Sequence, residues 1–114
     1  MTAHRWTALR PFPDPRKGEL LHAPIGPGVY DLRHISTKEP VLFGIGSRCA
    51  LRMSSLLPKP LGAGTRNNTA KRDYVLEHLN DIEYRTLPCA TRDEAAQAER
   101  NIKSKRGHDY KFKT

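Results

Sequence analysis

The chain has few cysteines, and their spacing argues against two common ways of stabilising a small protein. Its 114 residues include only two, Cys49 and Cys89, which do not form a C-x-x-C pair. Disulfide frameworks and structural zinc sites use more cysteines, or cysteines and histidines at short fixed spacings. The five histidines are scattered and none stands at an H-x-x-x-H spacing. We therefore expect two free thiols and no metal cage built from cysteine and histidine.

Long apolar runs are also missing. A membrane-spanning helix needs about 18 consecutive apolar residues, and no stretch of this sequence approaches that length. The start, MTAHRWTALRPF, lacks the apolar core of a signal peptide. We therefore expect a cytoplasmic protein that has no membrane partner.

Acidic residues are outnumbered by basic ones. The chain has 12 Asp and Glu against 20 Lys and Arg, a formal net charge of +8. Such an excess is typical of proteins that bind polyanions, with nucleic acid as the leading candidate. The basic residues concentrate in 47–73 and 100–114, each of which contains a single acidic residue. The alternative for these two segments is a charged surface that only keeps the protein soluble.

The length fits one domain preceded by a short arm. Residues 1–25 contain four of the nine prolines, and proline disfavours both a helix interior and a central strand. We therefore divide the chain into an N-terminal proline-rich arm, 1–25, and a domain, 26–114.

Hydrophobic periodicity within the domain predicts three strands and three helices. Alternating apolar residues on both sides of a polar turn predict a hairpin, and a capping box opens the last helix, with Thr91 at its N-cap and Glu94 three residues on. The order is strand-strand-helix-helix-strand-helix. We expect an α/β fold of the α+β type, with a small three-stranded, mainly antiparallel sheet flanked by helices. The strands fall near 28–32, 41–45 and 82–87, and the helices near 47–57, 69–79 and 91–106.

Three motifs in this order resemble a known family. GVY stands at 28–30 and FGIG at 43–46, directly before a helix that carries Arg52. The last helix contains EAAQAE at 94–99, which is similar to an E-A-x-x-x-E motif. Together they resemble the GIY-YIG nuclease family, over about residues 26 to 104.

The resemblance implies a metal-dependent endonuclease that hydrolyses DNA phosphodiester bonds. Tyr30 would orient or deprotonate the attacking water, Arg52 would contact the scissile phosphate, and Glu99 would hold Mg²⁺ or Mn²⁺. Each has a simpler alternative: a core aromatic for Tyr30, a solvated arginine for Arg52, and an exposed glutamate paired with Lys103 for Glu99. Arg48 is the second choice for the phosphate contact.

The basic residues around these motifs are expected to contact nucleic acid. DNA is the expected partner and RNA a second candidate, because phosphate contacts are largely independent of sequence. The predicted contact residues are Arg48, Lys59, Arg66, Lys71 and Arg72.

The sequence departs from the family at one position. Alignment of its G-I-G places Gly44 where the second tyrosine of the family stands, and Phe43 keeps a ring one position early. Four residues are candidates to replace the missing hydroxyl: Lys38, His34, Tyr74 and His78.

Three other functions compete with the nuclease. The departure at Gly44 favours a nucleic-acid-binding module that has lost catalysis on the same fold. The domain could also be the nuclease toxin of a larger secreted protein, which would have a small acidic inhibitor or immunity protein as partner. A small basic ribosome-associated protein explains the charge but gives Glu99 no role.

Overall fold

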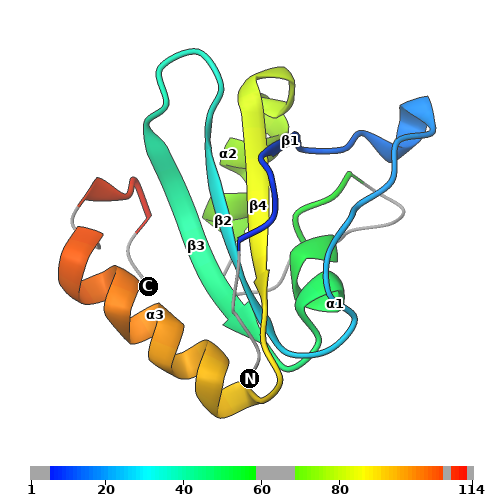
Figure 1. The fold of residues 1–114 in the computed structure, drawn as a ribbon. Helices are drawn as coiled ribbons and strands as arrows, with labels where there is room; N and C mark the ends of the chain where they lie inside the picture. Colours follow the sequence, from blue (N-terminus) through cyan, green and yellow to red (C-terminus); the bar gives the residue numbers. More distant parts are fainter. Residues whose placement is uncertain (1–5, 59–68, 107–108, 113–114) are drawn as a thin grey trace.

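Four antiparallel strands form the centre of the molecule in the order β1-β4-β2-β3 (Figure 1). The structure, a computed structural model, describes residues 6–58, 69–106 and 109–112. None of the helices in these ranges is both long and apolar enough to cross a membrane. The strands are β1 (Arg10–Pro11), β2 (Gly28–His34), β3 (Pro40–Gly46) and β4 (Ile82–Pro88).

The prediction of a three-stranded sheet is wrong, because the arm supplies a fourth strand. Arg10 and Pro11 pair with β4, and backbone bonds from the N–H of Thr7 and of Phe12 to β4 carbonyls, both 2.8 Å, flank the pair. Proline fits here because β1 is an edge strand, where a missing N–H costs no ladder bond. The element order is therefore β1, β2, β3, α1, α2, β4, α3, with short 3₁₀ turns at Pro15–Lys17 and Leu79–Asp81.

The predicted hairpin is confirmed and fixes the register of the sheet. β2 pairs with β3 so that Tyr30 lies opposite Gly44, and with β4 so that Tyr30 lies opposite Thr86. Successive side chains of a strand point to opposite faces. Tyr30, Gly44 and Thr86 therefore share one face, while their neighbours in sequence face the other way.

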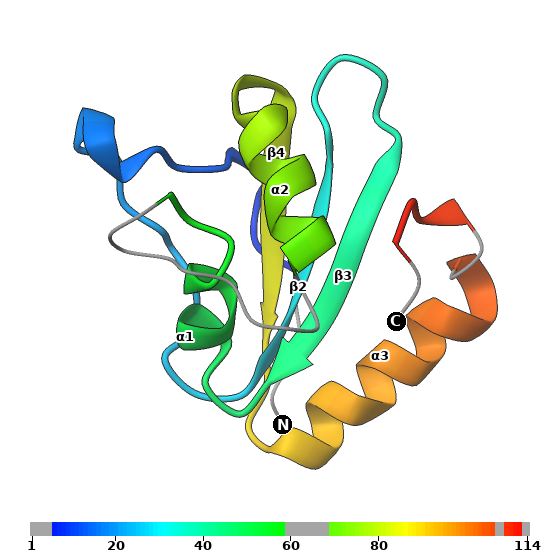
Figure 2. The ribbon, with the colours of Figure 1, turned by 180° about the vertical axis from the view of Figure 1, so that it is seen from behind.

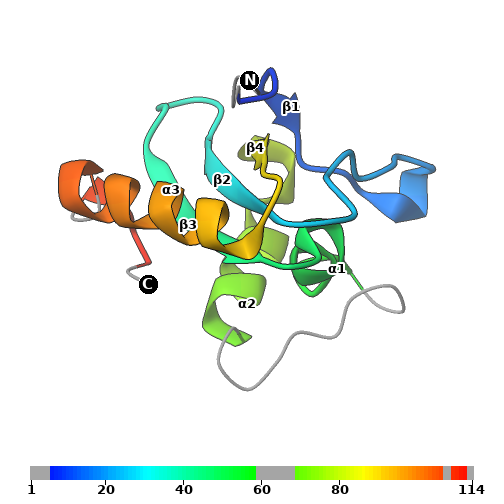
Figure 3. The ribbon, with the colours of Figure 1, turned by 60° about the horizontal axis from the view of Figure 1, so that its bottom comes forward.

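Helices cover both faces of the sheet (Figures 2 and 3). α1 (Cys49–Ser54) and α2 (Thr69–Glu77) pack on the face of Tyr30, where Met53 and Val75 are fully buried. α3 (Arg92–Arg106) covers the opposite face through Ala95, Ala98 and Ile102. Figure 2 shows α3 running beside β3, the edge strand of the sheet.

The capping box predicted at the start of α3 has both of its side-chain acceptors in use. The Thr91 hydroxyl accepts a bond of 3.1 Å from the Glu94 N–H, and the Glu94 carboxylate accepts one of 2.9 Å from the Ala90 N–H. The first bond satisfies one of the amides that a helix start leaves unpaired, and the second ties Ala90, the residue before the N-cap, to the helix instead of the N-cap amide itself. They fix where α3 begins, and thereby the position of Glu99 relative to the sheet.

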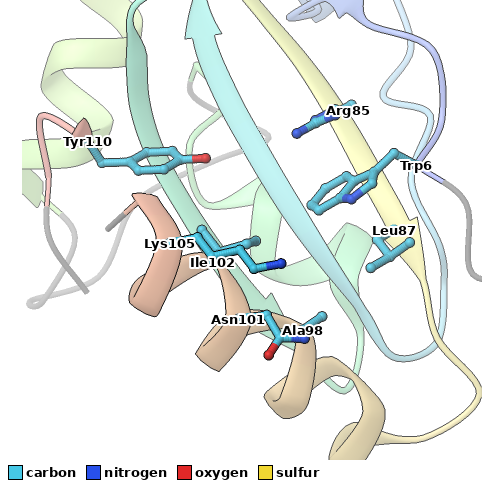
Figure 4. A pocket seen from close by; sticks show the side chains of 8 residues that line it. All are labelled: Trp6, Arg85, Leu87, Ala98, Asn101, Ile102, Lys105 and Tyr110. Atoms are coloured by element: carbon cyan, nitrogen blue, oxygen red, sulfur yellow. The ribbon is translucent and has the colours of Figure 1, made fainter. Parts of the chain in front are cut away.

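A buried carboxylate ties the arm and the C-terminal segment to the face of α3. Asp31 accepts a bond of 3.0 Å from Arg85 Nε and one of 2.7 Å from the Tyr110 hydroxyl. The Arg85 guanidinium also lies 4.3 Å from the centre of the Trp6 ring. Figure 4 shows Trp6 and Tyr110 at the rim of a cavity of about 260 Å³ between β4 and α3. This network and the cavity lie on the face of the sheet opposite Tyr30.

Tyr110 and Thr86 lie on opposite faces of the sheet, and removing their hydroxyl groups should affect stability differently. Tyr110→Phe leaves the buried Asp31 with one bond fewer, so we expect the free energy of unfolding to fall by about 1–3 kcal/mol. The buried Thr86 hydroxyl has no hydrogen-bond partner in the described residues. Thr86→Val should therefore leave stability unchanged or raise it slightly. Urea denaturation of the two variants measures both effects. Equal losses of unfolding free energy would contradict the difference in hydrogen bonding between the Tyr110 and Thr86 hydroxyls.

Candidate active site

Tyr30 occupies the middle of the sheet and is almost fully buried. The residue is 8% exposed and belongs to the apolar core under α1 and α2. Burial raises the pKa of the Tyr30 phenol more than the nearby Arg52 guanidinium lowers it. The phenol is therefore neutral at physiological pH, and it can donate or accept a hydrogen bond but is not a phenolate base.

The ring of Tyr30 covers the backbone of Gly44. A Cβ atom at position 44 would lie 2.6 Å from Cζ of Tyr30 and closer still to its hydroxyl oxygen. Because no side chain tolerates such a contact without movement, glycine is the residue that fits. The missing second tyrosine thus has a steric reason: the ring of Tyr30 fills the space that a side chain at 44 would need.

Arg52 reaches Tyr30 from α1. The charge of its guanidinium offsets part of the rise in the pKa of the Tyr30 phenol, while the residue as a whole is exposed to solvent. A Cβ atom at position 46 would lie 3.1 Å from Cβ of Arg52, so Gly46 lets α1 approach the end of β3. The predicted first choice for the phosphate contact therefore lies beside Tyr30 with part of its donor set facing solvent. Arg48, the second choice, occupies the N-cap position of α1 and lines a groove beside this helix.

Glu99 approaches the same place from α3. Its charge raises the pKa of both Tyr30 and Lys71, which puts the carboxylate within electrostatic reach of two residues from other elements. The side chain is 21% exposed, and Nζ of Lys103 lies 4.0 Å from its carboxylate. The pairing with Lys103 expected of a surface glutamate is thus present, and the carboxylate is also within electrostatic reach of Tyr30.

Lys71 joins this group from the first turn of α2. Burial lowers its pKa, Arg52 lowers it further and Glu99 raises it, so both charges lie within electrostatic reach of Lys71. The sequence predicted Lys71 only as a contact for nucleic acid. No periodicity or motif relates position 71 to position 99, so sequence reasoning had no signal for this neighbourhood. We call Tyr30, Arg52, Lys71 and Glu99 the Tyr30 cluster.

The residues proposed to replace the missing tyrosine lie elsewhere. His34 bonds Asp81 through Nδ1 at 2.9 Å and the Tyr74 hydroxyl through Nε2 at 2.6 Å. His78 stacks on the Tyr74 ring, with 4.1 Å between ring centres. His34 stands four residues beyond Tyr30 on β2, about 13 Å along the strand. These three side chains tie the far end of the hairpin to α2.

Lys38 and Arg72 are also engaged in the fold. Lys38 lies in the hairpin turn, with its ammonium 3.8 Å from the Glu83 carboxylate. Arg72 donates a bond of 3.1 Å to the carbonyl of Leu57 and so joins α2 to the segment after α1. Two other predicted contacts for nucleic acid, Lys59 and Arg66, lie outside the described residues.

Cysteine chemistry does not compete for this site. Burial raises the pKa of the Cys49 thiol to about 11, and burial also raises that of Cys89. The reactive form of cysteine is the thiolate. Both thiols are therefore protonated at physiological pH, and the pair is not disulfide-bonded.

The metal-binding capacity of the cluster rests on one carboxylate. Across the described ranges, no group of three or more His, Cys, Asp or Glu side chains gathers to form a metal cage. Mg²⁺ is commonly held by one or two carboxylates and completed by water and substrate phosphates. Glu99 fits that pattern, because it is partly exposed and lies beside Arg52 and Lys71, which favour an anionic substrate.

No match was found when the chain was compared with models of known protein families, with curated proteins or with solved structures.

The contact between Tyr30 and Gly44 can be tested by filling the space above the glycine. Gly44→Ala should push the Tyr30 ring out of place and lower the free energy of unfolding by about 1–3 kcal/mol. Gly26→Ala is the matched control, because a Cβ atom there meets nothing within 4 Å. We expect the control to change stability by less than about 0.5 kcal/mol in urea denaturation. Equal effects of the two substitutions would show that position 44 is not sterically closed.

Proposed function

We propose that the protein is a Mg²⁺- or Mn²⁺-dependent endonuclease of the GIY-YIG type that hydrolyses DNA phosphodiester bonds. One observation carries the proposal. Residues 30, 52 and 99, which the sequence motifs single out, come from β2, α1 and α3, and the charges of Arg52 and Glu99 both act on the pKa of Tyr30. Elements that are distant in the sequence thus bring both charges within electrostatic reach of Tyr30.

Arg52 suits the binding of the scissile phosphate. A guanidinium can bond two phosphate oxygens at once and keeps its charge at any physiological pH. The residue is exposed and lies within electrostatic reach of Tyr30, so its guanidinium is open to a substrate near that phenol. Lys71 adds positive charge where negative charge develops on the phosphate during hydrolysis.

Tyr30 would act as a neutral phenol. Since burial keeps it protonated, its role is to orient the attacking water by a hydrogen bond. In the reaction, an oxygen atom of water forms a bond to phosphorus, one ester P–O bond breaks, and the proton that the water loses ends on the leaving oxygen by way of solvent. Glu99 would hold the metal ion, which lowers the pKa of bound water and stabilises charge on the phosphate.

A binding module without catalysis is the second candidate, and Gly44 favours it. The chain lacks the second tyrosine, and the ring of Tyr30 occupies the space where its side chain would stand. If the proton of the attacking water has no acceptor here, the same cluster of Arg52 and Lys71 would still bind a phosphate.

Cleavage assays on matched variants separate the two candidates. Plasmid DNA, single-stranded DNA and RNA are incubated with the protein in Mg²⁺, in Mn²⁺ or in EDTA. We expect metal-dependent cutting of DNA that Glu99→Gln and Tyr30→Phe each reduce about 100-fold. Glu77→Gln removes an exposed carboxylate from α2 and should cut like the wild type.

Two outcomes would count against the proposed nuclease. Metal-dependent cutting that survives Glu99→Gln would remove Glu99 from the site. Retained DNA binding without cutting of any substrate, in a protein whose circular dichroism shows it to be folded, would favour the binding module.

A further inference from the structure

A basic groove lies beside Arg52, at the end of β3. Its volume is about 540 Å³. It is bounded by the last residues of β3, by α1 and by the first residue of α3. The groove is lined by Ile45, Gly46, Ser47, Arg48, Leu51, Arg52, Ser55 and Arg92. Three of these residues are arginines and none is acidic, so an anion is the ligand that the lining favours.

Two of the arginines come from different parts of the chain and are open to solvent. Arg48 occupies the N-cap position of α1, and Arg92 is the first residue of α3. Both are exposed, and in the described part of the chain neither forms an ion pair. Like charges around one groove repel each other, and an anion bound between them removes that repulsion.

The remaining lining suits a sugar-phosphate chain rather than a small inorganic ion. Gly46 is buried beneath Arg52, so α1 lies close to the end of β3 along the groove. Ile45 contributes an apolar wall, and Leu51 is 61% exposed at the rim. Guanidinium groups beside apolar surface match a ligand in which phosphates alternate with sugars and bases.

Arg52 joins this groove to the Tyr30 cluster, since it lines the groove and its charge also acts on Tyr30. We propose that the groove binds one strand of a polynucleotide, with Arg48 and Arg92 holding a phosphate next to the scissile one. This inference rests on the proposed function and adds a second phosphate subsite to it. Arg92 was not among the residues that the sequence indicated for nucleic acid.

The salt dependence of binding tests the subsite without any need for cleavage. A fluorescent 20-nucleotide single-stranded DNA is titrated in EDTA at several salt concentrations, with fluorescence anisotropy as the readout. We compare the wild type with the double variant Arg48→Gln, Arg92→Gln. Each phosphate contact contributes about 0.7 to the slope of log K against log salt concentration. Loss of the one phosphate that the two arginines hold should therefore lower the slope by about 0.7 and weaken binding about tenfold or more at low salt.

Two further double variants control for charge and folding. Arg10→Gln with Lys17→Gln removes the same charge at and beyond β1, on the opposite edge of the sheet from β3. It should leave the slope unchanged. Arg48→Lys with Arg92→Lys keeps the charge and should retain most of the slope. Thermal unfolding of each variant checks that it is folded.

The outcomes separate this inference from the proposed function. A groove variant whose slope equals that of the Arg10 and Lys17 variant would overturn the subsite, even if the wild type cuts DNA. A selective loss of slope in the groove variant would support the subsite, even if the wild type cuts nothing and the proposed nuclease fails.

Discussion

The packing of the Tyr30 ring on Gly44 is the contact on which the site depends. It requires the β2–β3 register that places the two residues opposite each other, and it leaves no room for a side chain at position 44. It also holds the phenol within electrostatic reach of Arg52 on α1. Because the ring is buried by its neighbours, the phenol stays neutral, and this protonation state decides which roles Tyr30 can have.

The sheet separates structural polar groups from those that are available for chemistry. Asp31, with its bonds to Arg85 and Tyr110, holds the arm and the C-terminal segment on the face of α3. His34 is committed to Asp81 and Tyr74 at the far end of the hairpin. In the Tyr30 cluster, by contrast, Arg52 is exposed and Glu99 is partly exposed. Satisfied and buried groups stabilise a fold, whereas charged groups that keep access to solvent can bind a ligand.

Patterns local in the sequence predicted most of the elements. Two alternating apolar runs predicted the hairpin, and Thr91 with Glu94 predicted the start of α3. β1 was missed because two residues, one of them proline, carry no periodicity. Their pairing depends on backbone bonds with β4, more than seventy residues later in the chain. A strand that short is created by its partner and not by its own residues.

The sequence by itself determined the nature and order of the chemical groups: the net positive charge, the motifs that contain Tyr30 and Glu99, and the glycine at position 44. Only the tertiary structure decided which groups meet. It placed Lys71 within electrostatic reach of Glu99 and put Arg92 and Arg48 in the lining of one groove. It also gave His34 a structural role. The reason is that charge and hydrogen bonding act over a few ångströms in space. Such neighbourhoods are set by how helices pack on a sheet, which residue spacing along a chain does not specify.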